Sequence, residues 1–173
     1  MGEYGDMVDG EVDLPALLRR LDEADALERP SGYHHGRTRA RFEALATRLG
    51  ADFEVHCRVD REVQDASLHG RIEIPSEALA GAAQLVVSVS NFGSLAVVSA
   101  ENPGVYTDLA EAVMAGAVVA GDLHTAVRAL ASFDYIQVPE ELLAQPYDGI
   151  SPLASFYPPD HPPDWWIRYF DYL

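Results

Sequence analysis

The stretch at residues 85–100, LVVSVSNFGSLAVVSA, constrains the fold more than any other part of the chain. It consists of two runs rich in β-branched residues, joined by a short connection that contains Asn91 and Gly93, which is typical of a β-hairpin. Both runs are apolar at almost every position instead of at alternate positions, and strands of this kind are buried on both faces. We therefore expect a central hairpin that is covered by helices.

Two helices are expected before this hairpin. Asp13 can cap the first helix, in which leucines recur at helical spacing until residues 30–32 break it. The second is expected to begin near Thr38 and to stop at Gly50. The preceding residues, 1–12, are rich in glycine and acidic residues and lack an apolar period, which predicts a flexible acidic tail.

Two strands are expected between the second helix and the hairpin. From residue 52 the apolar residues alternate, and residues 68–74 repeat this pattern. A register that places Glu54 opposite Arg71 would pair unlike charges and would set His56 beside His69. Four consecutive strands with short connections predict an antiparallel meander.

Helical spacing returns after the hairpin. Asp108 with Glu111 three residues later is typical of a capped helix start, and a second helix should follow Gly121. Residues 135–138 predict a short fifth strand, and residues 152–163 a proline-rich connection without regular structure. The chain should form an α+β fold over residues 1–173 as a single domain: a mostly antiparallel sheet of four to five strands, covered by helices from both ends of the chain.

The charge of the chain limits its partners. The formal net charge is −16, with 28 acidic residues against 12 basic ones, and every basic residue is arginine. From Ile72 onward, 13 acidic residues face two arginines. Such a surface repels nucleic acids and anionic membranes, and it attracts a basic protein. The alternative is that the acidic surface serves solubility alone.

The sequence also indicates a compartment. Cys57 is the single cysteine, which excludes an intramolecular disulfide and fits a reducing compartment. The acidic N-terminus is unlike a signal peptide, and no apolar run approaches the roughly 20 residues that cross a bilayer. We expect a cytoplasmic protein.

The motifs that could carry chemistry are weak. Asp65, Ser67 and His69 are the residue types of a hydrolase triad, but on a strand their spacing separates neighbours by about 6–7 Å. His34 and His35 lack further ligands nearby in the sequence, so we expect no metal and no cofactor. The turn at residues 91–93 is a candidate phosphate nest, but the sequence has no GxGxxG or GxxxxGK motif and almost no cation nearby.

The aromatic C-terminus allows two interpretations. Half of the sixteen aromatic residues lie between residues 147 and 173. The closing segment, residues 164–173, either docks on the domain and completes its core or forms a partner surface, since Trp and Tyr dominate binding hot spots. In the second case the partner-binding residues would be Asp160, Asp164, Trp165, Trp166, Tyr169, Asp171 and Tyr172.

Four stretches resemble segments of small bacterial proteins of unknown function or of immunity type: DASLHG, SNFG, VPEELLAQPYDG and WWIRYFDYL, all between residues 65 and 173. The resemblance implies a non-catalytic protein that neutralises a cognate toxin, often a basic nuclease, and it assigns no functional residue. We therefore expect an immunity or inhibitor protein for a basic protein partner. The alternatives are a small hydrolase or ligand-binding enzyme that uses His56, His69 and nearby carboxylates, or an accessory subunit. The oligomeric state stays open.

Overall fold

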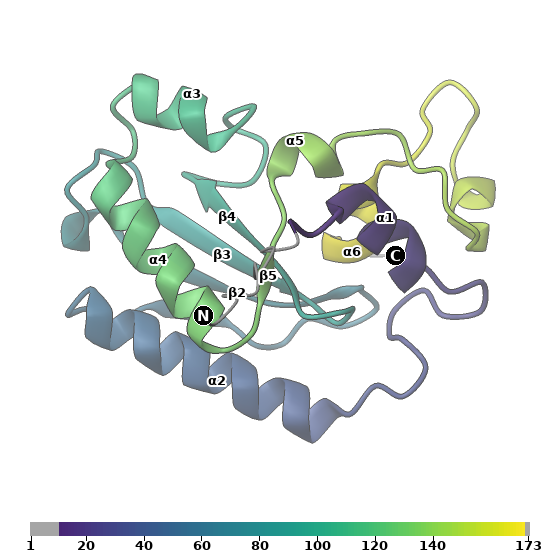
Figure 1. The fold of residues 1–173 in the computed structure, drawn as a ribbon, viewed down its shortest axis with the longest axis horizontal. Helices are drawn as coiled ribbons and strands as arrows, with labels where there is room; N and C mark the ends of the chain where they lie inside the picture. The colour runs from purple at the N-terminus through teal and green to yellow at the C-terminus, as the bar shows by residue number, and fades with distance from the viewer. Residues whose placement is uncertain (1–10, 172–173) are drawn as a thin grey trace, which may run out of the picture.

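The computed structural model describes residues 11–171 (Figure 1). Its centre is one five-stranded sheet in the order β1-β2-β3-β4-β5, with strands at Arg58–Asp60, Leu68–Ile74, Leu85–Ser90, Leu95–Ala100 and Ile136–Gln137. The first four strands form an antiparallel meander, and β5 pairs in parallel with β4. The expected α+β fold with a mostly antiparallel sheet is confirmed.

Helices precede and follow the meander. They are α1 (Leu14–Leu21), α2 (His35–Asp52), α3 (Leu109–Met114), α4 (Ala120–Ser132), α5 (Glu140–Leu143) and α6 (Trp165–Phe170), with 3₁₀ turns η1 (Ser76–Ala78) and η2 (Pro152–Phe156). Three of them begin at an aspartate cap: the carboxylates of Asp13, Asp108 and Asp164 each accept a backbone N–H of the first turn, and the caps at Asp13 and Asp108 are the expected ones. These caps explain why polar loops give way to helix at those positions.

The central hairpin is buried on both faces, as its apolar composition predicts. Every residue of β3 and β4 is buried. Val87, Val89 and Val98 face a core cluster shared with α2 and α4, while Leu95 and Val97 face a second cluster shared with α1 and α6. Figure 1 shows α2 and α4 on one side of the sheet and α1, α5 and α6 gathered on the other.

The region before β2 differs from the expectation. The α2 helix starts at His35 and continues to Asp52, past Gly50, because His34 caps it through Nδ1 and no turn interrupts its apolar face. Residues 53–57 therefore leave a helix end and are not strand, with Glu54 in the left-handed region at φ 50°. The observed register pairs Arg58 with Glu73 and Asp60 with Arg71, so the prediction that His56 lies beside His69 is wrong.

Three further predictions concern the proline-rich connection, the two ends of the chain and membrane-spanning helices. Residues 152–163 contain the 3₁₀ turn η2, although they were expected to have no regular structure. The predicted acidic tail lies mostly outside the described residues, as does Tyr172. Among the described helices, none is long and apolar enough to cross a membrane.

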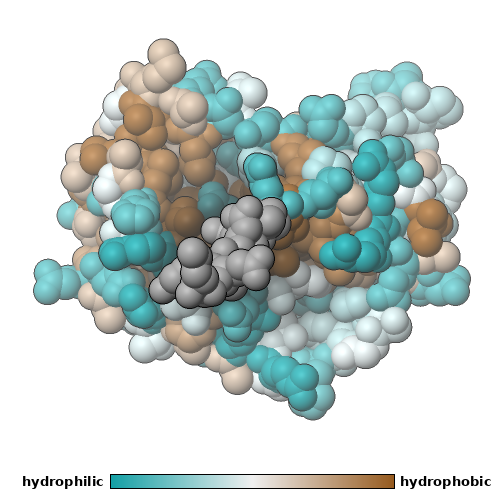
Figure 2. Space-filling model, viewed as in Figure 1, coloured by the Kyte–Doolittle hydropathy of each residue, from teal (hydrophilic) through white to brown (hydrophobic). Residues whose placement is uncertain are grey.

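One face of the molecule carries an exposed apolar patch. Figure 2 shows apolar side chains gathered over α3 and the adjoining part of α4. The exposed residues of that region are Val113, Met114 and Val119. The loop that leads from β4 into α3 borders the site described next.

Candidate functional site

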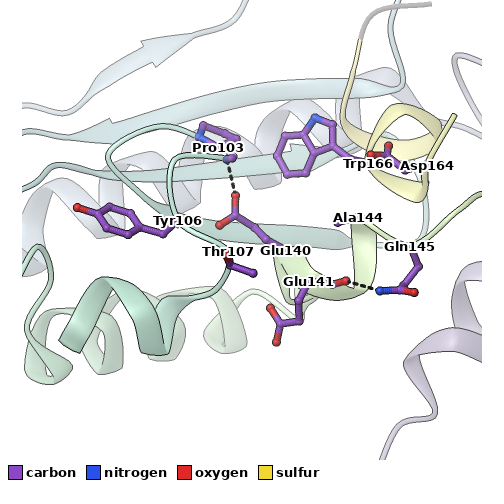
Figure 3. Close-up of a pocket in the computed structure, with 10 residues that line it drawn as sticks. Pro103, Tyr106, Thr107, Glu140, Glu141, Ala144, Gln145, Asp164 and Trp166 are labelled. Atoms are coloured by element: carbon purple, nitrogen blue, oxygen red, sulfur yellow. Dashed lines mark hydrogen bonds between the residues drawn. The ribbon is translucent and has the colours of Figure 1, made fainter. Parts of the chain in front are cut away.

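A hollow of about 490 Å³ opens between the β4–α3 loop, α5 and the start of α6 (Figure 3). The loop supplies Pro103, Gly104 and Tyr106, and the two helices supply Glu140 and Trp166. Three segments that are far apart in the sequence thus meet at one site. We call it the acidic groove, because three of its lining residues are acidic and none is basic.

Glu140 lies at the centre of the acidic groove. Its Oε1 accepts hydrogen bonds from the hydroxyl of Ser99 at 2.9 Å and from the backbone N–H of Gly104 at 3.1 Å. Its Oε2 has no hydrogen-bond partner among the described residues. Burial is the main cause that raises the pKa of Glu140, and the two hydrogen bonds oppose this shift. The fold therefore fixes the orientation of this carboxylate while one of its oxygens stays open to a ligand.

Trp166 and Asp164 form the α6 side of the acidic groove. Figure 3 shows the indole of Trp166 beside the Glu140 carboxylate. Asp164 is half-buried, and its Oδ1 accepts the N–H of Ile167 at 2.9 Å as the cap of α6. Burial, as the largest cause, raises the pKa of Asp164. Asp164 thus holds Trp166 in place and contributes negative charge to the same wall.

This combination of groups suits a cation with an apolar stem. A guanidinium or ammonium group is attracted by the face of an indole and by nearby carboxylates, and the methylene stem of arginine or lysine packs against apolar surface. Glu141 adds a further exposed carboxylate at the rim. The acidic groove therefore has the chemistry of a receptor for a basic side chain.

The structure separates the residues that were predicted to bind a partner. Trp165 and Tyr169 are 3% and 0% exposed and belong to the core beneath α6, where Trp165 packs on the ring of Tyr147 at 4.8 Å. Their burial agrees with the alternative in which the closing segment completes the core. Asp164 and Trp166 line the acidic groove.

The other predicted residues lie apart from the acidic groove. Asp160 is exposed and pairs with His161 at 3.2 Å. The backbone carbonyl of Asp171 accepts the N–H of Ser67 at 3.2 Å, which ties the end of the chain to β2. Tyr172 lies outside the described residues.

The histidines and the triad residues make other contacts. His69 is buried, its Nδ1 lies 3.1 Å from Oδ1 of Asn91, and burial lowers its pKa. The hydroxyl of Ser67 donates to the Asp171 carbonyl at 3.3 Å, and Asp65 is exposed. His56 is exposed before β1. Within residues 11–171, no cluster of three or more His, Cys, Asp or Glu side chains is placed to hold a metal ion.

Sequence reasoning missed Glu140 and Tyr106. Glu140 sits 24 residues before Asp164 in the sequence, and Tyr106 precedes it by a further 34. Glu140 and Tyr106 come close to Trp166 only in the folded chain, in which β5 pairs with the edge strand β4 and α5 follows β5. The available signal was the pair Glu140-Glu141 directly after Pro139, an acidic helix start that no nearby basic residue neutralises.

Comparisons with known proteins add no assignment. No protein-family model, no curated protein and no solved structure matches the chain.

Proposed function

We propose that this protein is a non-catalytic binding protein that neutralises a basic protein partner, such as a bacterial toxin, and that the acidic groove holds an arginine or lysine of that partner. The observation that carries the proposal is the Glu140 carboxylate beside the indole of Trp166, in a hollow lined by acidic but not by basic residues.

The energetics of the acidic groove favour a cation. A carboxylate that burial has partly desolvated regains free energy when a cation approaches, because the local dielectric is lower than in water. The half-buried indole of Trp166 adds a cation–π contact worth about 0.5–2 kcal/mol. Long-range attraction by the formal net charge of −16 would speed the encounter with a basic protein.

A matched pair of double variants tests the proposal. Glu140→Gln with Glu141→Gln removes two charges from the acidic groove, and Glu62→Gln with Glu77→Gln removes two exposed charges elsewhere. Each protein is immobilised and exposed to a cytoplasmic extract of the native host, and retained proteins are identified by mass spectrometry. We expect a basic protein that the wild type and the Glu62/Glu77 variant retain and that the groove variant loses.

The captured protein is then purified, and its dissociation constant is measured at increasing NaCl concentration. We expect the affinity to fall as salt rises, because charge attraction is screened. Equal retention by the two double variants would show that bulk charge, and not the acidic groove, is responsible. An affinity that is indifferent to salt would contradict the electrostatic argument.

A further inference from the structure

A second hollow, of about 210 Å³, has the opposite chemistry. It lies between the first two turns of α2 and the β3–β4 turn, with Tyr135 from the connection between α4 and β5. Its lining includes two arginines, Arg37 and Arg41, and no acidic residue. A hollow with arginines and no carboxylate in its lining is unusual in a chain with a formal net charge of −16. We call it the arginine hollow.

Arg41 is held in place by neutral groups. Its Nε donates to the carbonyl of Phe133 at 2.6 Å, and its Nη1 donates to the hydroxyl of Ser94 at 2.8 Å. The guanidinium carbon lies 4.0 Å from the centre of the Tyr135 ring. The positive charge of Arg41 is therefore oriented by the fold, yet no carboxylate of the described residues compensates it.

Two buried donors, one in this guanidinium and one on the tyrosine ring that it covers, have no acceptor. Nη2 of Arg41 and the hydroxyl of Tyr135 are both buried without a hydrogen-bond partner among the described residues. Tyr135 is only 8% exposed, and burial raises its pKa to about 12, so the hydroxyl keeps its proton at neutral pH. A buried donor without an acceptor costs about 1–3 kcal/mol. Arg41 and Tyr135 both line the hollow, so an anion seated there lies beside the side chains that carry these two donors.

The surrounding residues add further attraction for an anion. Arg37 lies one helical turn before Arg41, is exposed, and its side chain makes no ion pair with the described residues. The hollow also lies against the first turn of the 18-residue helix α2, whose N-terminal end carries partial positive charge. Ser94 lines the same wall with its hydroxyl, whereas the hydroxyl of Thr38 donates to the carbonyl of His34 at 3.2 Å.

We propose that the arginine hollow binds a phosphate group, either as free phosphate or as a small phosphate monoester. Two guanidinium groups and several hydroxyls offer more donors than the two oxygens of a carboxylate can use, whereas the three terminal oxygens of a phosphate match them. The β3–β4 turn at residues 91–93 lacks cations nearby in the sequence, and the fold supplies them from α2. The site is independent of the acidic groove, which is built from other elements.

The test titrates inorganic phosphate, phenyl phosphate and acetate into the protein at constant ionic strength and measures binding by calorimetry. We expect saturable, one-site binding of phosphate or phenyl phosphate and weaker binding of acetate. Tighter binding of phenyl phosphate would identify a monoester as the ligand, and tighter binding of inorganic phosphate would identify the free ion. Acetate binding as tightly as both, or no saturable binding of either phosphate, would overturn the proposal.

Three variants separate the site from general charge effects. Arg37→Gln removes an exposed guanidinium that the fold does not use, and we expect about a tenfold or greater loss of phosphate affinity. Tyr135→Phe removes only an unpartnered hydroxyl, so the protein should stay folded while phosphate affinity falls severalfold. Arg20→Gln, an equally exposed arginine on α1, should leave phosphate affinity unchanged. Equal losses in Arg37→Gln and Arg20→Gln would overturn the proposal.

Discussion

Arg168 is the most constrained side chain of the described chain. It is fully buried, and its Nε donates to Oδ1 of Asp22 at 2.6 Å. Its other nitrogens donate to the carbonyls of Leu27 and Ala26 at 3.0 and 2.7 Å, and the guanidinium lies over the ring of Phe92. A buried charge is tolerated only when it is paired and hydrogen-bonded, and here every polar nitrogen is satisfied. This network explains why the aromatic closing segment docks on the loop after α1.

Replacing Arg168 by methionine should destabilise the protein strongly. The variant would leave the buried Asp22 without its arginine partner, and breaking a buried pair in this way costs about 3–5 kcal/mol. The free energy of unfolding is measured by urea denaturation. The control is Arg19→Met, which removes an arginine from an exposed pair with Asp148 and should change stability little. Equal losses in the two variants would contradict a special role of the buried pair.

Glu140 should make stability depend on pH. Its pKa is raised above 4.5 in the folded protein, so the folded state binds a proton more tightly than the unfolded state. Stability therefore falls as pH rises from about 4.5 through the raised pKa. Glu140→Gln lacks this loss, and its advantage in unfolding free energy over the wild type should grow across that window and then level off. Urea unfolding at a series of pH values measures this difference, with the exposed Glu62→Gln as control. A difference that stays constant with pH would contradict the prediction.

At the scale of elements, the sequence predicts those helices and strands that are determined by nearby residues, such as a helix cap or an apolar run. The hairpin of β3 and β4 follows from its apolar runs, and the start of α3 follows from the cap at Asp108. The strand expected at residues 53–57 does not form, because α2 extends to Asp52 and the chain must turn at Glu54 before β1. Apolar alternation alone cannot show where a preceding helix ends, since that depends on packing against α4 and the sheet.

The same limit applies to the sites. Asp164 and Trp166 are recognisable from the sequence because they stand in a short segment dense in acidic and aromatic residues. Glu140, Arg41 and Tyr135 are not, because each acquires its neighbours through contacts between distant elements. The sheet order that brings β5 beside β4 is the step that sequence patterns leave open.

Gly70 should be essential where β2 crosses α2. A Cβ at this position would lie 2.6 Å from the Asp60 carbonyl oxygen and 2.7 Å from Cζ of Phe42, both of which are held in the core or the sheet. Gly70→Ala is therefore expected to cost about 1–3 kcal/mol of unfolding free energy, as overpacking does. Gly121→Ala is the control, because no atom lies within 4 Å of its Cβ. Thermal and urea unfolding measure both; unchanged stability of Gly70→Ala would show that the strand shifts freely.

At the scale of the whole molecule, the excess of acidic residues in the later part of the sequence places most of the negative charge on the later elements of the fold. Of the two arginines after Ile72, Arg168 is buried and Arg128 is exposed, so the later elements present mostly acidic side chains. The acidic groove is built entirely from these elements, whereas the arginine hollow takes its cations from α2. The described residues thus form two separate hollows whose charged lining residues have opposite signs.

The net charge should also make the folded state more stable in salt. A formal net charge of −16 on 173 residues creates self-repulsion in the folded state, which added ions screen. The exposed ion pairs, such as Arg19 with Asp148, lose strength in salt as well, but such pairs contribute little. Between about 20 and 500 mM NaCl at pH 7, we expect the urea midpoint to rise. Binding of a basic partner should weaken over the same range, so the two responses have opposite signs. A falling urea midpoint would show that ion pairs, and not repulsion, dominate the electrostatics of this fold.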